Sequence, residues 1–149
     1  MSVRVSHDLF ISKEMIPFDT DAVDRAINSF LSKDYIRIRE IDSFLIFPNV
    51  GYEWNEYLLE SFLLSYSKKF ALVNNGLSLN NVAGFVVKKS GQINDFIDAC
   101  AAFLADGRIE LKKVDALNYL ADMNVISRRS YKDIDLALRR AAQIRRRKE

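Results

Sequence analysis

The chain has 149 residues, of which 49% are hydrophobic and 28% charged, with 5 glycines, 2 prolines and a net charge of +2. This composition can bury a core, which excludes disordered, collagen-like and low-complexity chains. One cysteine excludes a disulfide framework, one histidine excludes most histidine-rich metal sites, and no apolar run reaches the ~18–20 residues of a membrane span. We therefore expect one α+β domain over residues 1–149 that is cytoplasmic, with no cofactor, no metal and no membrane partner.

Charge is distributed unevenly along the chain. Residues 1–107 have a net charge of −4, from 10 Lys/Arg and 14 Asp/Glu, whereas residues 108–149 have +6, from 12 and 6. A basic end on a mildly acidic body is typical of proteins that bind a polyanion or an acidic protein. The basic part 108–149 is therefore the first place to look for a partner.

The first third of the chain predicts an extended segment, a helix and a hairpin. Residues 3–16 read as a strand or short extended segment that Pro17 closes. Apolar residues then recur at helical spacing from a cap at Asp19 or Thr20 to an end near residues 33–34. Residues 35–39 alternate with a period of two, which predicts a strand with Arg37 and Arg39 on one face, and residues 44–47 read as the returning strand.

The middle of the chain predicts an apolar helix followed by further strands. Residues 52–70 carry a broad apolar face and read as the longest apolar helix. The Asn75-Gly76 pair predicts a hairpin turn between residues 71–73 and 77–79, and residues 82–87 read as a buried strand. A helix over 93–105 ends at Asp106-Gly107, because glycine tolerates the left-handed cap.

The last third is helical. A helix over 112–122, a turn over 123–126 and a helix from Ser130 towards Arg147 form a helix-turn-helix-like pair, with a near capping box at the start of the last helix. The predicted fold class is therefore α+β, with about five helices and a small, mainly antiparallel sheet.

The last helix is the candidate nucleic-acid-binding element. Its apolar stripe would fix it to the core, while its basic face would reach phosphates and base edges. The ordinary alternative is a solvated terminal helix whose arginines favour its own negative end. The candidate contacts to DNA or RNA are Arg128, Arg129, Lys132, Arg139, Arg140, Arg145, Arg146 and Arg147.

A protein partner is the second hypothesis. Trp54 and Tyr57 follow the break at residues 48–51, where an exposed aromatic ring could anchor another chain, although rings at helical spacing usually belong to the core. In this interpretation the chain is a small adaptor subunit whose basic end binds an acidic surface of another protein. A homo-oligomer is the other possibility.

Enzymatic function has the least support in the sequence, so we expect no catalytic residues. The common nucleotide-binding, hydrolase and zinc-protease motifs are absent. Glu110-Leu111-Lys112 has the spacing of some metal-dependent nucleases, which would need a second ligand from Asp95, Asp98 or Asp106. Cys100 lies among small apolar residues, which favours a buried, unreactive thiol.

Overall fold

The computed structural model describes residues 2–76 and 81–148, which form five α-helices and two small antiparallel sheets, so the predicted α+β class is confirmed. No helix within these residues is long and apolar enough to cross a membrane. The helices are α1 (Thr20–Asn28), α2 (Glu56–Ser65), α3 (Phe96–Asp106), α4 (Lys113–Asp122) and α5 (Ile134–Arg147). The strands are β1 (Ser2–Arg4), β2 (Phe10–Ser12), β3 (Tyr35–Arg37), β4 (Phe70–Val73) and β5 (Phe85–Lys88), and two 3-10 turns span Lys13–Met15 and Ile38–Glu40.

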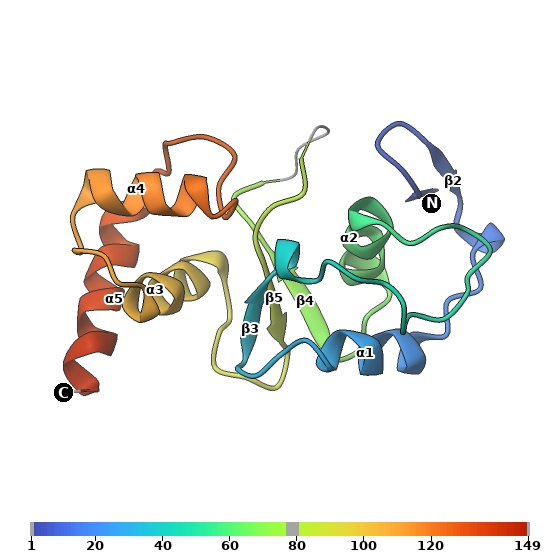
Figure 1. The fold of residues 1–149 in the computed structure, drawn as a ribbon, viewed down its shortest axis with the longest axis horizontal. Helices are drawn as coiled ribbons and strands as arrows, with labels where there is room; N and C mark the ends of the chain where they lie inside the picture. Colours follow the sequence, from blue (N-terminus) through green and yellow to red (C-terminus); the bar gives the residue numbers. More distant parts are fainter. Residues whose placement is uncertain (1, 77–80, 149) are drawn as a thin grey trace.

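A three-stranded sheet stands at the centre of the molecule. Its strands lie in the order β3-β5-β4, and Val86 of β5 pairs with Ile36 on one side and Leu72 on the other. Because successive side chains of a strand point to opposite faces, Val86 enters the core beside α1 and α2, while Phe85 and Val87 enter the core beside α3, α4 and α5. The sheet thus separates the basic helical end from the rest of the chain (Figure 1).

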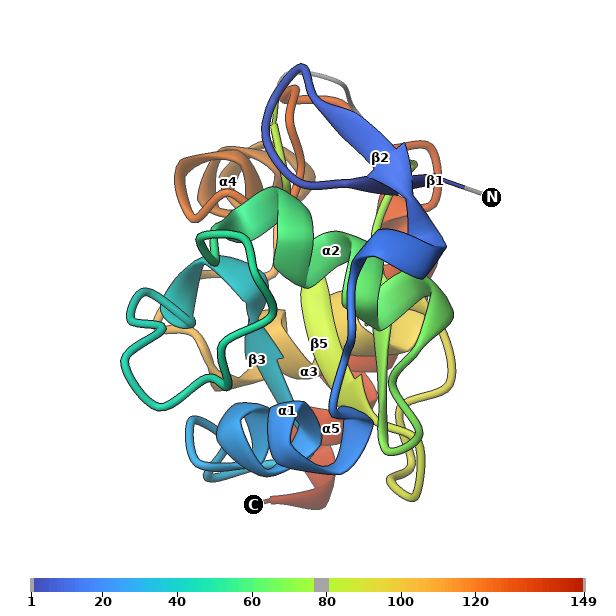
Figure 2. The ribbon, with the colours of Figure 1, turned by 90° about the vertical axis from the view of Figure 1, so that its right-hand side faces the viewer.

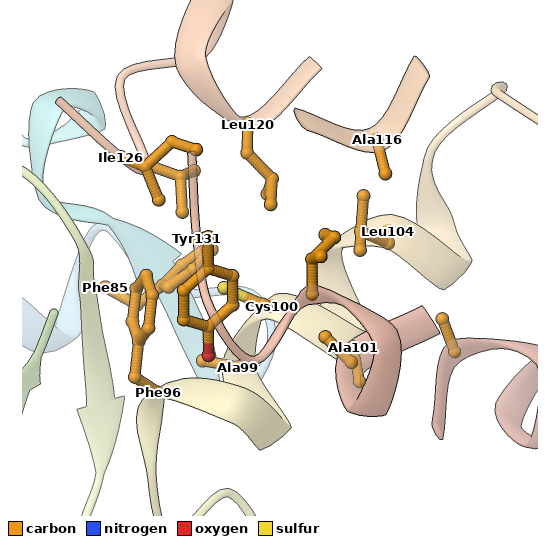
Figure 3. Close-up of a cluster of buried hydrophobic side chains, with 14 of the residues drawn as sticks. Phe85, Phe96, Ala99, Cys100, Ala101, Leu104, Ala116, Leu120, Ile126 and Tyr131 are labelled. Carbon is orange, nitrogen blue, oxygen red and sulfur yellow. The ribbon is translucent and has the colours of Figure 1, made fainter. Parts of the chain in front are cut away.

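The core on the C-terminal side is built from three helices and one strand. Figure 3 shows Leu104 of α3, Leu120 of α4 and Phe85 of β5 directed into one cluster, and all three are fully buried. Helix α5 packs closely along α3 through small residues, including Ala101 and Ala137. This packing fixes the orientation of α5 and therefore decides which of its side chains face solvent.

The core on the other side holds α1 and α2 with the N-terminal hairpin β1–β2, which lie in front of the sheet in Figure 2. Asp24 of α1 is 2% exposed and accepts hydrogen bonds from Ser67 Oγ at 2.6 Å and from the Lys68 and Lys69 amides. These bonds tie α1 to the segment that leads from α2 into β4. The buried carboxylate is therefore fully used within the fold.

Two predicted helices are longer than the observed ones. Helix α1 ends at Asn28, where the Ser29 hydroxyl donates to the Ala26 carbonyl, and it does not reach residues 33–34. Helix α2 covers Glu56–Ser65, not residues 52–70, because the Asn55 side chain caps it by accepting from the Tyr57 and Leu58 amides. Local hydrogen bonds from short polar side chains thus set these boundaries.

The predicted strand over residues 44–47 is wrong. The segment makes a turn in which the Phe47 amide donates to the Phe44 carbonyl, so both rings pack against Trp54. Leu45 and Ile46 consequently point outwards and are 94% and 60% exposed. A run of apolar residues without a clear period could not distinguish this aromatic turn from a strand.

Two strands of the central sheet, β3 and β5, are also shorter than expected. Strand β3 ends at Arg37, and Arg39 lies in a 3-10 turn, so the two arginines do not share a strand face as predicted. Strand β5 begins only after Gly84, which has a φ of +111°. The predicted partner strand over residues 77–79 lies outside the described residues.

Residues 123–133 connect α4 to α5, which replaces the short turn predicted between these helices. Helix α5 begins at Ile134 after Asp133, whose side chain makes no capping hydrogen bond, so the predicted capping box at Ser130 is not formed. The connection is held to the core by buried Val125, Ile126 and Tyr131. The connection therefore crosses the core as a series of turns and bends, and the helix begins only at Ile134.

Candidate nucleic-acid interface

Helix α5 divides into a buried face and a solvent face. Ile134, Ala137 and Ala141 are buried in the core, as their spacing predicted. Because these residues fix the helix orientation, the opposite side is solvent-exposed over more than two turns. We name this exposed set the α5 outer face, and it comprises Arg139, Gln143, Arg146 and Arg147.

Arg129 and Arg140, two of the candidate contacts, are engaged within the fold: Arg129 joins the connection between α4 and α5 to α4, and Arg140 joins α5 to α3. The Arg129 guanidinium binds the Asp122 carboxylate at 2.8 Å and the Asn118 side chain at 3.0 Å, both on α4. Arg140 Nη1 binds Asp98 Oδ1 at 2.7 Å on the first turn of α3, with Asp95 at 3.8 Å. Binding of phosphate by either arginine would have to compete with these carboxylates.

Arg145 caps the end of α3. Although Arg146 and Arg147 face solvent, Arg145 is partly buried and donates to three main-chain carbonyls. The bonds reach Leu104 at 3.0 Å, Ala105 at 3.1 Å and Gly107 at 2.7 Å. The last carbonyls of a helix have no partners within the helix, so a cation there is favourable. The role of Arg145 in the structure is to join α5 to the end of α3.

The remaining candidate cations are available to a ligand. Among residues 2–76 and 81–148, no ion pair or side-chain hydrogen bond engages Arg128, Lys132, Arg139 or Arg147, and all four are exposed. Arg146 donates only to the Ala142 carbonyl of its own helix, at 3.4 Å. Three of these five cations lie on the α5 outer face, where their charge is not neutralised by a partnered carboxylate.

A cleft adjoins the α5 outer face. It has a volume of about 590 Å³ and lies between α5, α3, the residues that precede β3 and those that follow β5. Gln143 and Arg147 belong both to the α5 outer face and to the lining of this cleft. A ligand held on the helix surface can therefore reach the cleft without crossing another element.

A hydrogen-bonded network around Asp106 closes one end of the cleft. Asp106 accepts from Lys33 at 3.0 Å, from Tyr35 at 2.7 Å and from Lys148 at 2.8 Å. Burial alone would raise the pKa of Asp106, but these three hydrogen bonds outweigh it and hold the pKa well below its usual range. Burial and the bond to Asp106 raise the pKa of Tyr35. The network joins β3, α3 and the residue that follows α5.

Trp54 and Tyr57, the candidate partner contacts, are partly buried and engaged within the chain. Trp54 Nε1 donates to the Pro48 carbonyl at 2.7 Å, and its ring packs on Phe44 and other rings. The Tyr57 ring lies 4.1 Å beneath the Arg4 guanidinium. Trp54 also lines a groove of about 380 Å³ that is open at the surface.

The residues of the nuclease hypothesis do not come together. Glu110 pairs with Lys112 at 2.9 Å, while Asp98 and Asp106 bind the cations of α5 and its end. Within the described residues, no three His, Cys, Asp or Glu side chains gather at a spacing that could hold a metal ion. Cys100 is buried, and burial raises the pKa of its thiol.

Comparison of the chain with protein-family models, with curated proteins and with solved structures found no match. Sequence reasoning missed the Asp106 network, whose partners lie 42–73 positions from Asp106, and it missed Gln92, which joins the cleft lining from a different part of the chain. No local sequence pattern predicts such contacts.

Proposed function

We propose that this protein is a non-enzymatic nucleic-acid-binding module that holds a phosphate backbone on the α5 outer face. The observation that carries the proposal is the separation of roles along α5. Arg140 and Arg145 are engaged by α3, whereas Arg139, Arg146 and Arg147 face solvent without a carboxylate partner among residues 2–76 and 81–148.

The physical reason is the free energy needed to free each arginine from its existing contacts before it binds phosphate. An arginine that already binds a carboxylate or a helix end must break that contact before it binds phosphate. An exposed arginine without such a partner binds phosphate and releases condensed counterions from the strand, which favours binding at low salt. The rigid packing of α5 against α3 also keeps the three arginines in a fixed arrangement, which lowers the ordering cost.

The test is fluorescence anisotropy with labelled single-stranded and double-stranded oligonucleotides at low salt. The variant Arg139→Gln/Arg146→Gln/Arg147→Gln removes the cations of the α5 outer face and should weaken binding about tenfold or more. The matched control, Arg25→Gln/Lys68→Gln/Lys69→Gln, removes the same charge from exposed positions on α1 and on the segment between α2 and β4.

The comparison separates local contact from net charge. The control should retain affinity within about threefold. The cations that contact the phosphates contribute more to affinity than the total charge does, and the control leaves those cations in place. An equal loss in both variants, or no binding by the unmodified protein, contradicts the proposal.

The alternative function is a small interaction subunit that associates through apolar surface. The observation that favours it is the exposed pair Leu45 and Ile46, which extends outwards beside the groove lined by Trp54. Sedimentation of the protein and of Leu45→Ser/Ile46→Ser tests this function in its homo-oligomeric form. Self-association that the double variant abolishes supports it, and a monomer at high concentration contradicts it.

A further inference from the structure

The cleft beside α5 has the dimensions of a small-molecule site and a lining that mixes polar and apolar residues. Its volume of about 590 Å³ lies within the range of about 300–1,000 Å³ typical of ligand pockets. Apolar atoms of Ile93, Ala102 and Ile144 and the ring of Tyr35 form part of its wall. The flat face of a ring could lie against these groups.

Gln92 and Gln143 place two carboxamide groups in the lining of the cleft. Gln92 and Gln143 line the cleft from different elements, both are exposed, and neither side chain makes a hydrogen bond within the described part of the chain. A carboxamide offers a donor and an acceptor side by side, which matches the edge of a nucleobase. The pair therefore favours a ligand that carries both kinds of group.

The charges of the cleft argue against a free phosphate as its main ligand. Arg140 is paired with Asp98, and Lys148 is paired with Asp106 at 2.8 Å. Asp34 adds a further carboxylate to the lining. Because carboxylates match the cations in number, the cleft suits a neutral polar ring better than an isolated anion.

The position of the cleft connects such a ring to a strand. Arg147 belongs to the cleft and also to the α5 outer face, and it has no carboxylate partner among the described residues. A phosphate bound by Arg147 would hold its attached nucleoside near Gln143. The cleft and the outer face can therefore engage one nucleotide together.

We infer that the cleft accepts one unpaired nucleobase from a strand whose phosphates lie on the α5 outer face. This inference rests on the proposed function and narrows it to single strands and strand ends. A base inside an uninterrupted duplex would have to unstack and unpair before it entered the cleft, which costs free energy. The protein should therefore prefer unpaired nucleotides to continuous duplex.

The first experiment measures affinity for two labelled strands of equal length and equal phosphate number. One is oligodeoxyadenylate, and the other is an abasic strand that lacks every base. The unmodified protein should bind oligodeoxyadenylate about 5- to 100-fold more tightly, because enclosure of a single base contributes an effect of that order. Equal, salt-dependent affinity for both strands would overturn the inference about the cleft and leave the proposed function standing.

Two variants assign the preference to the cleft. Ala102→Leu fills the cleft from its wall, and Gln92→Ala removes an exposed carboxamide that the core does not need. Either change should reduce the preference for bases while affinity for the abasic strand stays within about twofold. The matched control is Ala142→Leu, which makes the same change on α5 away from the cleft and should retain the preference.

A direct probe tests whether a nucleotide enters the cleft. Adenosine 5′-monophosphate, titrated at low salt, should shift the side-chain amide signals of Gln92 and Gln143 in the nuclear magnetic resonance spectrum, and Ala102→Leu should suppress the shift. If neither strand binds but the nucleotide shifts both amides saturably, the cleft binds a free nucleotide, and both the proposed function and the inference that rests on it are wrong. If neither the strands nor the nucleotide produces an effect, both are wrong.

Discussion

Replacement of Arg145 by methionine tests whether the basic helix contains structural as well as binding arginines. Methionine retains an apolar stem but removes three hydrogen bonds from the guanidinium to the end of α3. Hydrogen bonds to charged groups contribute about 1.5–3 kcal/mol each, and partial exposure lowers the sum because water replaces part of the interaction. We expect Arg145→Met to reduce the free energy of unfolding by about 2–4 kcal/mol.

The assay is urea unfolding followed by circular dichroism, with a thermal scan as a second measurement. For a chain of this length, a loss of that size should lower the melting temperature by about 5–15 °C. The matched control is Arg139→Met, which removes the same charge from an exposed position on the same helix. The control should change the free energy of unfolding by no more than about 0.5 kcal/mol.

Equal unfolding midpoints for Arg145→Met and Arg139→Met would refute the reasoning. In that case the Arg145 hydrogen bonds would contribute nothing to stability, and Arg145 would again be a candidate contact to nucleic acid. A stability loss confined to Arg145→Met would instead require that binding data on this variant be corrected for unfolded protein.

Three further predictions concern the fold. Leu120→Ala should lower the free energy of unfolding in urea by about 2–5 kcal/mol, because Leu120 is fully buried. Leu45→Ala, at a position that is 94% exposed, should change it by no more than about 0.5 kcal/mol. Similar losses in the two variants would contradict the assigned core. Gly84→Ala should destabilise by at least about 1 kcal/mol, since Gly84 has a positive φ and the added Cβ would clash with the Val73 carbonyl oxygen of β4, and an unchanged midpoint would disprove this contact. The pKa of Asp106 is lower in the folded state than in the unfolded state, so its contribution is present above the unfolded pKa and is lost as pH falls through the folded one. When the free energy of unfolding is measured from pH 7 downwards, Asp106→Asn should therefore lose less of it below about pH 4 than the unmodified protein does. Parallel profiles for the two proteins would show that protonation of Asp106 does not affect stability.

Patterns that repeat within one element were sufficient to predict much of the fold. The spacing of Ile134, Ala137 and Ala141 identified the buried side of α5, and the alternation around Ile36 identified β3. Such patterns are reliable because they follow directly from the geometry of helices and strands.

Element boundaries were harder to predict because contacts distant in sequence or single polar atoms decide them. Residues 44–47 look like a strand until Trp54 is placed beside Phe44 and Phe47. Similarly, Asp24 draws the backbone after α2 out of the helix through hydrogen bonds to residues more than 40 positions away. Neither effect has a local signature.

The candidate site was predictable as a region but not as a set of roles. The charge excess located the basic end, and the helical period predicted that Arg139 and Arg146 lie on one face. Periodicity could not show that Arg140 meets Asp98 or that Arg145 meets the end of α3, because those partners belong to another helix. Identical side chains thus differ in role through their neighbours in space.

The dependence of affinity on salt concentration tests the central claim most directly. For single strands, the slope of log K against log salt is about −0.7 for each phosphate neutralised. With three phosphates bound on the α5 outer face, we predict that Arg139→Gln/Arg146→Gln/Arg147→Gln makes the slope shallower by about 2, while the control triple variant retains the slope of the unmodified protein. An unmodified protein whose affinity does not change with salt, or a slope that the outer-face variant leaves unchanged, would contradict the account.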